Sequence, residues 1–183
     1  MRVPALTPET LNAAQRKLWE RIASGPRGGV RGPYFALLHS PALCEGFEAV
    51  GRFLRYECAV PSRLRELAIL VVARRWKASY EWFAHAPIAA KEGIAPGIIE
   101  AIRTQGTPVF TNQDERTIYE FVRELMHTGF VDDARFAAAQ ALLGTTGIVD
   151  LVGFVGQYNS VALVLNAFEI GVPEGSTDPF SNT

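Results

Sequence analysis

The chain has 183 residues, 48% of them hydrophobic, which is enough to fold as one domain around a single sizeable core. Its 18 basic and 19 acidic side chains nearly cancel, so we expect neither a nucleic-acid partner nor a membrane partner. No uninterrupted apolar run approaches the roughly 20 residues of a transmembrane helix, and the first residues lack the apolar segment of a signal peptide. We therefore expect a cytoplasmic protein.

Helical patterns follow one another along nearly the whole chain, and no alternating strand pattern of useful length occurs. Thr7 is the predicted N-cap of the first helix, with Pro8 at its first position, and a Gly/Pro-rich loop covers residues 24–33. The last helix is apolar nearly all round, so we expect it to be central. The predicted helices span residues 7–24, 41–58, 61–76, 80–93, 96–106, 112–129, 131–144 and 145–171.

These patterns predict an all-α fold with about eight helices. Residues 1–172 form one predicted domain, and residues 173–183 form a C-terminal tail that is either mobile or reaches a neighbouring subunit. Cys44 and Cys58 lie 14 residues apart on one predicted helix, which separates them by about 21 Å. A disulfide needs Cα atoms within about 7 Å, so we expect both thiols to be reduced and buried.

Three polar side chains interrupt the apolar helical pattern between residues 65 and 93. Glu81 and His85 are four residues apart and share one helix face, and Glu66 lies on the preceding helix. If the break near Ala78 folds the two helices together, Glu66 faces the start of the second helix. A structural explanation also fits this spacing: Glu66 pairs with Arg63, Glu81 favours the helix N-terminus, and His85 is a hydrogen-bonded core histidine.

The same stretch resembles the carboxymuconolactone decarboxylase and alkyl hydroperoxidase D superfamily. The resemblance rests on the order of "RELAIL", then "YEW" at a helix start, then a histidine followed by small residues in "HAPIAAKEGI". It extends to "LLHSPAL" before this stretch, to "PGIIEAI" and "DERTIYEFVREL" after it, and to "QYN" in the last helix. It implies the alkyl hydroperoxidase D-like helical fold and a homo-oligomer, a trimer or hexamer.

The resemblance also implies two kinds of chemistry. In the redox branch, a glutamate and a histidine activate a Cys-x-x-Cys pair at a helix start. Glu66 and His85 match the glutamate and the histidine, whereas Ala78 and Glu81 occupy the two cysteine positions. The decarboxylase branch keeps the Tyr-Glu-Trp element and the histidine, as in "YEWFAH", although its members often carry a cysteine where this chain has Ala78.

Without the cysteine pair, the remaining groups suit acid-base chemistry. We predict that His85 transfers a proton, that Glu66 orients it, and that Glu81 shares this task or polarises the substrate. Cationic residues before the helix break would anchor a carboxylate, His39 and Tyr34 follow the glycine loop and would close over the pocket, and Tyr158 would line a cavity. The predicted substrate-binding residues are Tyr80, Trp82, Lys77, Arg74, His39, Tyr34 and Tyr158.

The leading hypothesis is therefore a cofactor-independent enzyme, a lyase (decarboxylase), isomerase or hydrolase, acting on a small organic acid or lactone. We expect no metal, since the chain offers neither His-x-x-x-His nor a Cys pair. One alternative is an antioxidant hydroperoxide reductase of the peroxiredoxin type, which the missing cysteine pair disfavours. The other is a non-catalytic oligomer that binds a small ligand.

Overall fold

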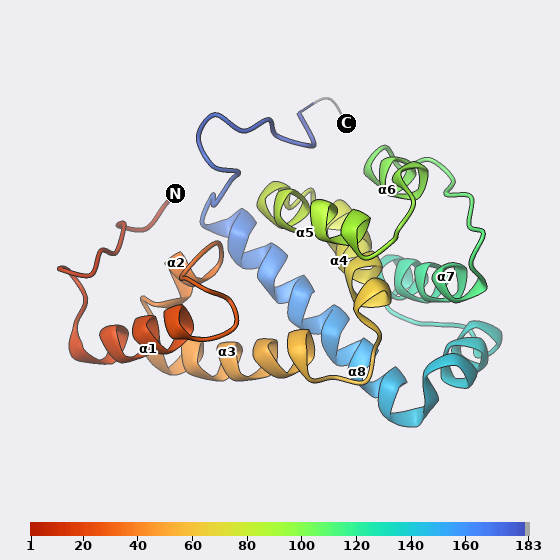
Figure 1. Ribbon diagram of the computed structural model, residues 1–183, viewed down its shortest axis with the longest axis horizontal. Helices are drawn as coiled ribbons and strands as arrows, with labels where there is room; N and C mark the ends of the chain where they lie inside the picture. Colours follow the sequence, from red (N-terminus) through yellow and green to blue (C-terminus); the bar gives the residue numbers. More distant parts are fainter. Residues whose placement is uncertain (182–183) are drawn as a thin grey trace.

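The structure, a computed structural model, describes residues 1–181, and this part of the chain folds into eight helices without a β-strand (Figure 1). The predicted all-α fold is therefore confirmed. The helices are α1 (Ala13–Ser24), α2 (Tyr34–Leu37), α3 (Pro41–Tyr56), α4 (Ser62–Trp76), α5 (Ser79–Lys91), α6 (Pro96–Arg103), α7 (Gln113–Thr128) and α8 (Asp133–Ala167).

Two helices, α4 and α8, form the centre of the fold. Helix α4 packs against α5, α6, α7 and α8, and it is buried on nearly every side between Leu64 and Arg74. Helix α8 runs diagonally through the molecule and packs against α3, α4 and α7 (Figure 1). The burial of α4 explains why it shows no clean amphipathic pattern in the sequence, since a helix covered on nearly all sides needs no polar face.

The first helix starts later than the sequence suggested. The predicted cap at Thr7 is wrong, because Thr7 and Thr10 form a separate turn and α1 begins after Asn12. The Asn12 side chain accepts a hydrogen bond from the Gln15 N–H at 3.0 Å, and the Gln15 side chain accepts one from the Asn12 N–H at 3.0 Å. This reciprocal capping box satisfies two backbone donors, which a Thr-Pro start does not.

The turn between α4 and α5 decides how the polar residues meet. Lys77 ends α4 in the left-handed conformation, with φ 48° and ψ 40°, and Ala78 is already the N-cap of α5. The predicted break at residues 77–79 is thus confirmed. Because the turn is so short, α5 folds back along α4 and faces it.

Helix α8 contains one break, at Gly144, whose φ of 69° and ψ of 176° are not helical. The separate helices expected at 131–144 and 145–171 are therefore two arms that meet at a kink, as glycine permits. By length and composition α8 also meets the test for a membrane-spanning helix, which the sequence analysis did not expect. A soluble protein's core helix passes the same test, and the packing of α8 against three helices fits that explanation.

The C-terminal tail folds back onto its own chain. The Ser79 hydroxyl donates to Asp178 at 2.7 Å, and the buried Phe180 ring packs edge-on against Trp82 at 5.3 Å between centroids. These contacts attach the tail to α5 of its own chain, and the expectation of a mobile tail or of an arm onto another subunit stays a prediction. The two last positions of that predicted segment, 182 and 183, lie outside the described residues.

One face of α8 carries small and apolar residues that nothing in the described chain covers. We call it the α8 stripe, and its spacing of three, four and seven positions places its members on one side of the helix. Val149 is 65% exposed. The stripe consists of Val149, Val152, Gly153, Gly156 and Leu163.

We expect the chain to form a homo-oligomer through the α8 stripe, since exposed apolar patches mark protein contacts. Light scattering at micromolar concentration should give a multiple of the 20.1 kDa chain mass, and Val149→Asp should reduce it. Val109→Asp is the matched control, because Val109 is 84% exposed in a loop. A wild-type mass of one chain would contradict the prediction.

Candidate functional site

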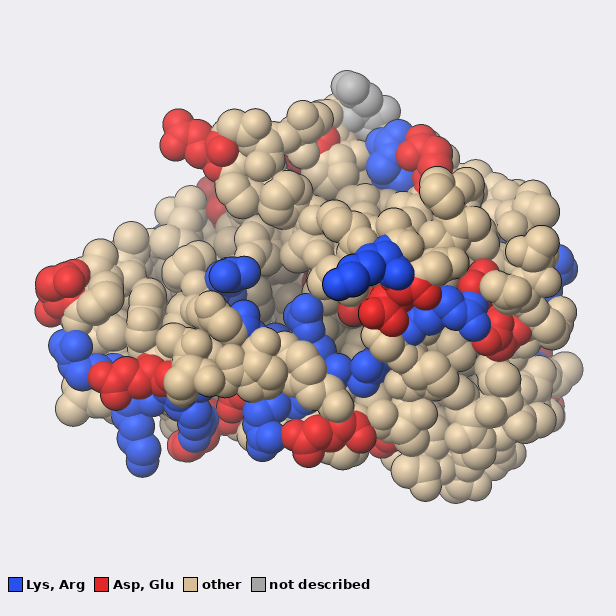
Figure 2. Space-filling model, viewed as in Figure 1, with Lys and Arg blue, Asp and Glu red and all other residues tan. Residues whose placement is uncertain are grey.

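A cavity of about 470 Å³ opens between the loop before α2, helix α3, helix α5 and helix α8. Figure 2 shows this face hollowed between α3 and α5, with blue side chains gathered around the hollow. The volume lies within the roughly 300–1,000 Å³ of small-molecule sites. Both Glu81 and His85 line it from α5.

His85 is hydrogen-bonded to Glu66 inside the protein. The distance from His85 Nδ1 to Glu66 Oε2 is 2.7 Å, and both side chains are buried. Arg63, the alternative partner of Glu66, instead binds Asp114 at 2.6 Å and also Glu115 on α7. The polar residues of α4 therefore have separate tasks, since Arg63 joins α4 to α7 and Glu66 is left to hold His85.

The bond from Glu66 fixes the state of the imidazole. A carboxylate accepts hydrogen bonds, so Nδ1 carries the proton and Nε2 is the free base. Burial lowers the pKa of His85 below its ordinary value, although the bond to Glu66 opposes this effect. We therefore expect a neutral His85 at pH 7. The Tyr158 ring contacts the imidazole edge-on, with centroids 5.5 Å apart.

Glu81 is the acidic group in the described lining of the cavity, and its environment favours the protonated form. Its side chain is buried, and Oε2 has no hydrogen-bond partner among the described residues. Burial raises the pKa of Glu81 well above its ordinary value, Arg55 opposes the shift, and Glu66 adds to it. A buried carboxyl group kept neutral in this way can donate its proton.

Arg55 is a functional candidate that the sequence analysis missed. It lines the cavity from α3 and forms a hydrogen bond with the Tyr158 side chain. Arg27 and Gln157 line the same cavity and were missed as well. No sequence pattern distinguishes these residues from other arginines and polar groups, because they converge from the loop, α3 and α8 only in the folded chain.

Three of the predicted substrate-binding residues line the cavity: Tyr34, Tyr80 and Tyr158. Burial raises the pKa of Tyr34 to about 12, against the opposing effect of Arg27, so its hydroxyl remains a donor at neutral pH. The other four predicted residues, Trp82, Arg74, Lys77 and His39, lie outside the cavity lining.

Each of these four residues lies elsewhere in the fold, with contacts or exposure that keep it away from the cavity. Trp82 points to the far side of α5, where it packs on Phe180. Arg74 faces a second cavity between α4, α6 and α7, and Lys77 lies in the exposed left-handed turn. His39 lies on the surface, where its Nε2 is 3.0 Å from the Pro4 carbonyl oxygen and ties down the N-terminal segment.

Solved structures of similar shape decide the fold. A peroxidase-related protein described as an alkylhydroperoxidase AhpD core, from Ralstonia eutropha JMP134, superposes with a TM-score of 0.77 at 16% identity. The match covers 98% of this chain and 94% of that one. The chain has the AhpD-like fold.

Two further proteins share the AhpD-like fold. An uncharacterized peroxidase-related protein from Silicibacter sp. TM1040 has a TM-score of 0.74 at 18% identity, covering 96% of this chain and 91% of that one. The debrominase Bmp8, as a cysteine-to-alanine variant in complex with 2,3,4-tribromopyrrole, has a TM-score of 0.72 at 13% identity, covering 98% and 94%. No protein-family profile and no curated protein matches the sequence.

The burial of Glu81 predicts a pH-dependent cost to folding. As the pH rises above about 4.5, the unfolded chain loses this proton before the folded chain does, so the folded state loses stability. The loss amounts to at most about 1.4 kcal/mol per pH unit. Glu81→Gln cannot ionise, so the difference between its free energy of unfolding and that of wild type should increase as the pH rises above about 4.5, until the folded carboxyl group ionises as well.

Denaturant unfolding at several pH values measures this gain. Glu92→Gln, at the exposed C-terminal end of α5, is the matched control and should show no such trend. A stability difference between Glu81→Gln and wild type that does not change with pH would mean that Glu81 is ionised in the folded protein.

Proposed function

We propose that this protein is a cofactor-independent acid-base enzyme that acts on a small organic acid or lactone. One observation carries the proposal: His85, held by Glu66 at 2.7 Å, lines the same cavity as Glu81, whose buried Oε2 has no hydrogen-bond partner among the described residues. A base of fixed tautomer and an acid kept neutral by burial are the two groups that proton transfer to and from carbon requires.

His85 is the base in this proposal. Its Nε2 accepts a proton from substrate carbon or from water, and the resulting imidazolium is stabilised by Glu66 at Nδ1. The carboxylate on α4 therefore acts through the histidine and need not touch the substrate.

Glu81 is the acid. Its carboxyl O–H donates a proton to a substrate oxygen or to a carbanion, and Arg55 nearby stabilises the carboxylate that remains. Used with His85, it moves a proton from one substrate atom to another, which is an isomerisation. In a decarboxylation, the C–C bond breaks, CO₂ leaves, and the acid protonates the carbon that keeps the electron pair. In lactone hydrolysis, the base activates water and the acid protonates the leaving oxygen.

The fold is compatible with such a ligand. A debrominase of the same fold has been solved with a tribrominated pyrrole, which is a small ring compound. The cavity here has aromatic walls from Tyr34, Tyr80 and Phe47, and its volume of about 470 Å³ lies in the usual range for small-molecule sites. We infer that it takes a molecule of about one substituted ring.

His85→Gln should lower turnover by about 10² to 10⁴, the usual contribution of a positioned acid-base group. Glu66→Gln alone should cost less, because the histidine remains. The double variant should cost little beyond His85→Gln, since residues that act as a unit are not additive. The measurement is turnover of unsaturated carboxylic acids and lactones, screened by mass spectrometry, followed by a double-mutant cycle. Strictly additive losses would assign Glu66 and His85 to separate steps.

Two controls accompany this cycle. Circular dichroism should show unchanged helix content in all three variants. His39→Gln, on the surface away from the cavity, should keep full turnover. An unimpaired His85→Gln enzyme would show that the histidine has only a structural role.

A thiol peroxidase is the second candidate function, because similar structures carry peroxidase-related names. The two thiols of this chain do not suit it. Cys44 is buried, and burial raises the pKa of its thiol to about 11, so the reactive thiolate is disfavoured. Cys58 is half-buried and donates to the Leu54 carbonyl at 2.9 Å. Ala78 and Glu81 occupy the start of α5, where the redox pair would lie.

We therefore expect no turnover of hydroperoxides with a dithiol reductant. The measurement is the rate of peroxide consumption with the protein compared with the rate without it. Turnover that disappears in Cys44→Ser or Cys58→Ser would establish the peroxidase instead. A ligand that binds the cavity while no compound is turned over would support the third possibility, a non-catalytic binding protein.

A further inference from the structure

The cavity wall opposite α5 contains a small cradle of hydrogen-bond donors around Gly51. A side-chain Cβ placed on Gly51 would lie 3.1 Å from Arg27 Nη2, 3.2 Å from Gln157 Nε2 and 3.8 Å from the Tyr34 hydroxyl. The two nitrogen distances are shorter than ordinary Cβ contacts, so Arg27 and Gln157 pack directly against the glycine backbone. Three groups that can donate hydrogen bonds, from the loop, α8 and α2, thus converge at the cavity wall beside Gly51.

Arg27 brings a positive charge to the cradle. Its guanidinium lies over the Tyr34 ring at 5.1 Å and over the Tyr56 ring at 5.9 Å, and its buried Nε has no hydrogen-bond partner among the described residues. Within residues 1–181, Arg27 forms no ion pair with a carboxylate. Arg27 is half-buried, and a partly desolvated charge without an acidic partner gains when a ligand supplies one.

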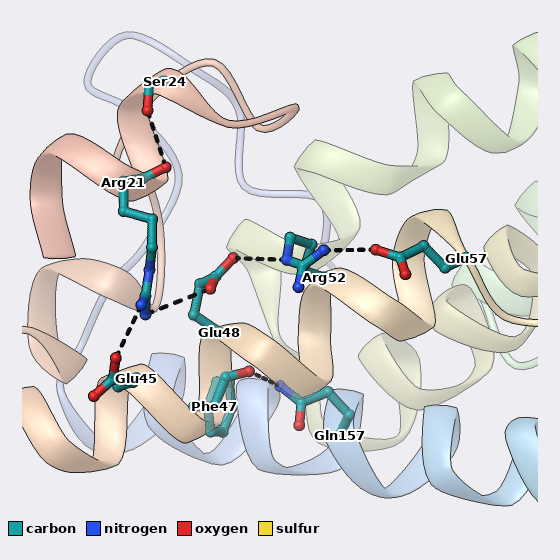
Figure 3. A network of polar contacts seen from close by, with 8 residues as sticks. All are labelled: Arg21, Ser24, Glu45, Phe47, Glu48, Arg52, Glu57 and Gln157. Carbon is teal, nitrogen blue, oxygen red and sulfur yellow. Dashed lines mark hydrogen bonds and ion pairs between the residues drawn. The ribbon is translucent and has the colours of Figure 1, made fainter.

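The nearby acid Glu48 does not fill this role. It is held between Arg21, at 3.7 Å, and Arg52, at 3.9 Å, and Figure 3 shows this chain of contacts running along α3. The same figure shows the Gln157 amide directed at the Phe47 carbonyl, a bond of 3.2 Å. An amide nitrogen has two hydrogens, so Gln157 keeps a second donor.

Taken together, the charged residues around the cavity favour the binding of an anion. Arg27, Arg31 and Arg55 line it, and Glu81 is the one acidic residue among the described residues of its lining. The blue side chains around the hollow in Figure 2 show the same imbalance on this face. Low-dielectric walls strengthen the attraction for an incoming anion.

We propose that Arg27, Gln157 and Tyr34 form a carboxylate-binding cradle at Gly51 and that Arg27 is the residue that selects anionic substrates. The flat guanidinium, confined by two tyrosine rings, presents its donors in one plane, and a carboxylate matches that plane. The orientation rests on the function proposed above: the carboxylate lies at Gly51, and the reacting carbon lies toward Glu81 and His85.

Calorimetric titration with benzoate and with its uncharged analogue benzamide tests the cradle without any turnover. Wild-type protein should bind benzoate at least tenfold more tightly than benzamide. Arg27→Gln should remove most of this preference by lowering the affinity for benzoate about 10- to 100-fold. Both effects are on the order expected for a charged hydrogen bond. Arg123→Gln removes an exposed charge on α7, outside this cavity, and should bind as wild type does.

A second variant keeps the charge and displaces the donors, because a Cβ on Gly51 would crowd Arg27 Nη2 and Gln157 Nε2. Gly51→Ala adds one methyl group at the point where the donors converge, and alanine is a better helix former than glycine, so α3 should remain folded. Gly51→Ala should lower the affinity for benzoate about tenfold and change the affinity for benzamide little. The cradle is overturned if benzoate does not bind at millimolar concentration, if benzamide binds equally well, or if Arg27→Gln keeps wild-type affinity for benzoate.

The outcomes separate the cradle from the proposed reaction. Benzoate binding that depends on Arg27, with no turnover of any compound, supports the cradle and contradicts the reaction. Turnover that depends on His85, with KM unchanged in Arg27→Gln, supports the reaction and overturns the cradle.

Discussion

The site depends on one buried hydrogen bond, the one between Glu66 and His85. It joins α4 to α5, and α5 carries both side chains of the proposed chemistry. Its length of 2.7 Å is short for a nitrogen–oxygen pair, as expected when one partner is charged. The bond is possible because Lys77 adopts a left-handed conformation and reverses the chain within two residues, so that position 66 comes to face position 85. Backbone geometry at a turn therefore determines the protonation state of an imidazole.

Burial acts in opposite directions on the two groups of α5 and gives them different roles. It disfavours the charged form of each, so it lowers the pKa of the His85 imidazole and raises that of the Glu81 carboxyl. Both shifts favour the neutral forms, a base and an acid four residues apart on one helix. Arg55 then limits the effect, because its charge favours an ionised Glu81 once the proton has left.

The sequence predicted the elements well where local chemistry decides them, and less well where distant segments meet. The helix break at residues 77–79 and the glycine at 144 follow from local composition, and the spacing of Glu81 and His85 follows from the helical period. The start of α1 was predicted at Thr7 and lies instead after Asn12, because the reciprocal Asn12–Gln15 bonds cap the helix there. Arg27, Arg55 and Gln157 could not be found from periodicity, since three different segments bring them to one cavity. Trp82 shows the converse error. It follows Glu81 directly in the sequence, but adjacent residues of a helix point in different directions, so Trp82 lies away from the cavity.

The docked C-terminal tail affects more than the shape of the surface. Among the described residues, the Ser79–Asp178 hydrogen bond and the packing of Phe180 on Trp82 attach it to α5, and the Arg103–Pro179 hydrogen bond attaches it to α6. Terminal segments on the surface open locally at a free-energy cost below that of global unfolding. When this segment detaches, water reaches the Trp82 side of the helix that holds Glu81 and His85. Amide hydrogens in the first turns of α5 should then exchange with solvent through this local opening, whereas those in the middle of α4 exchange only when the whole chain unfolds.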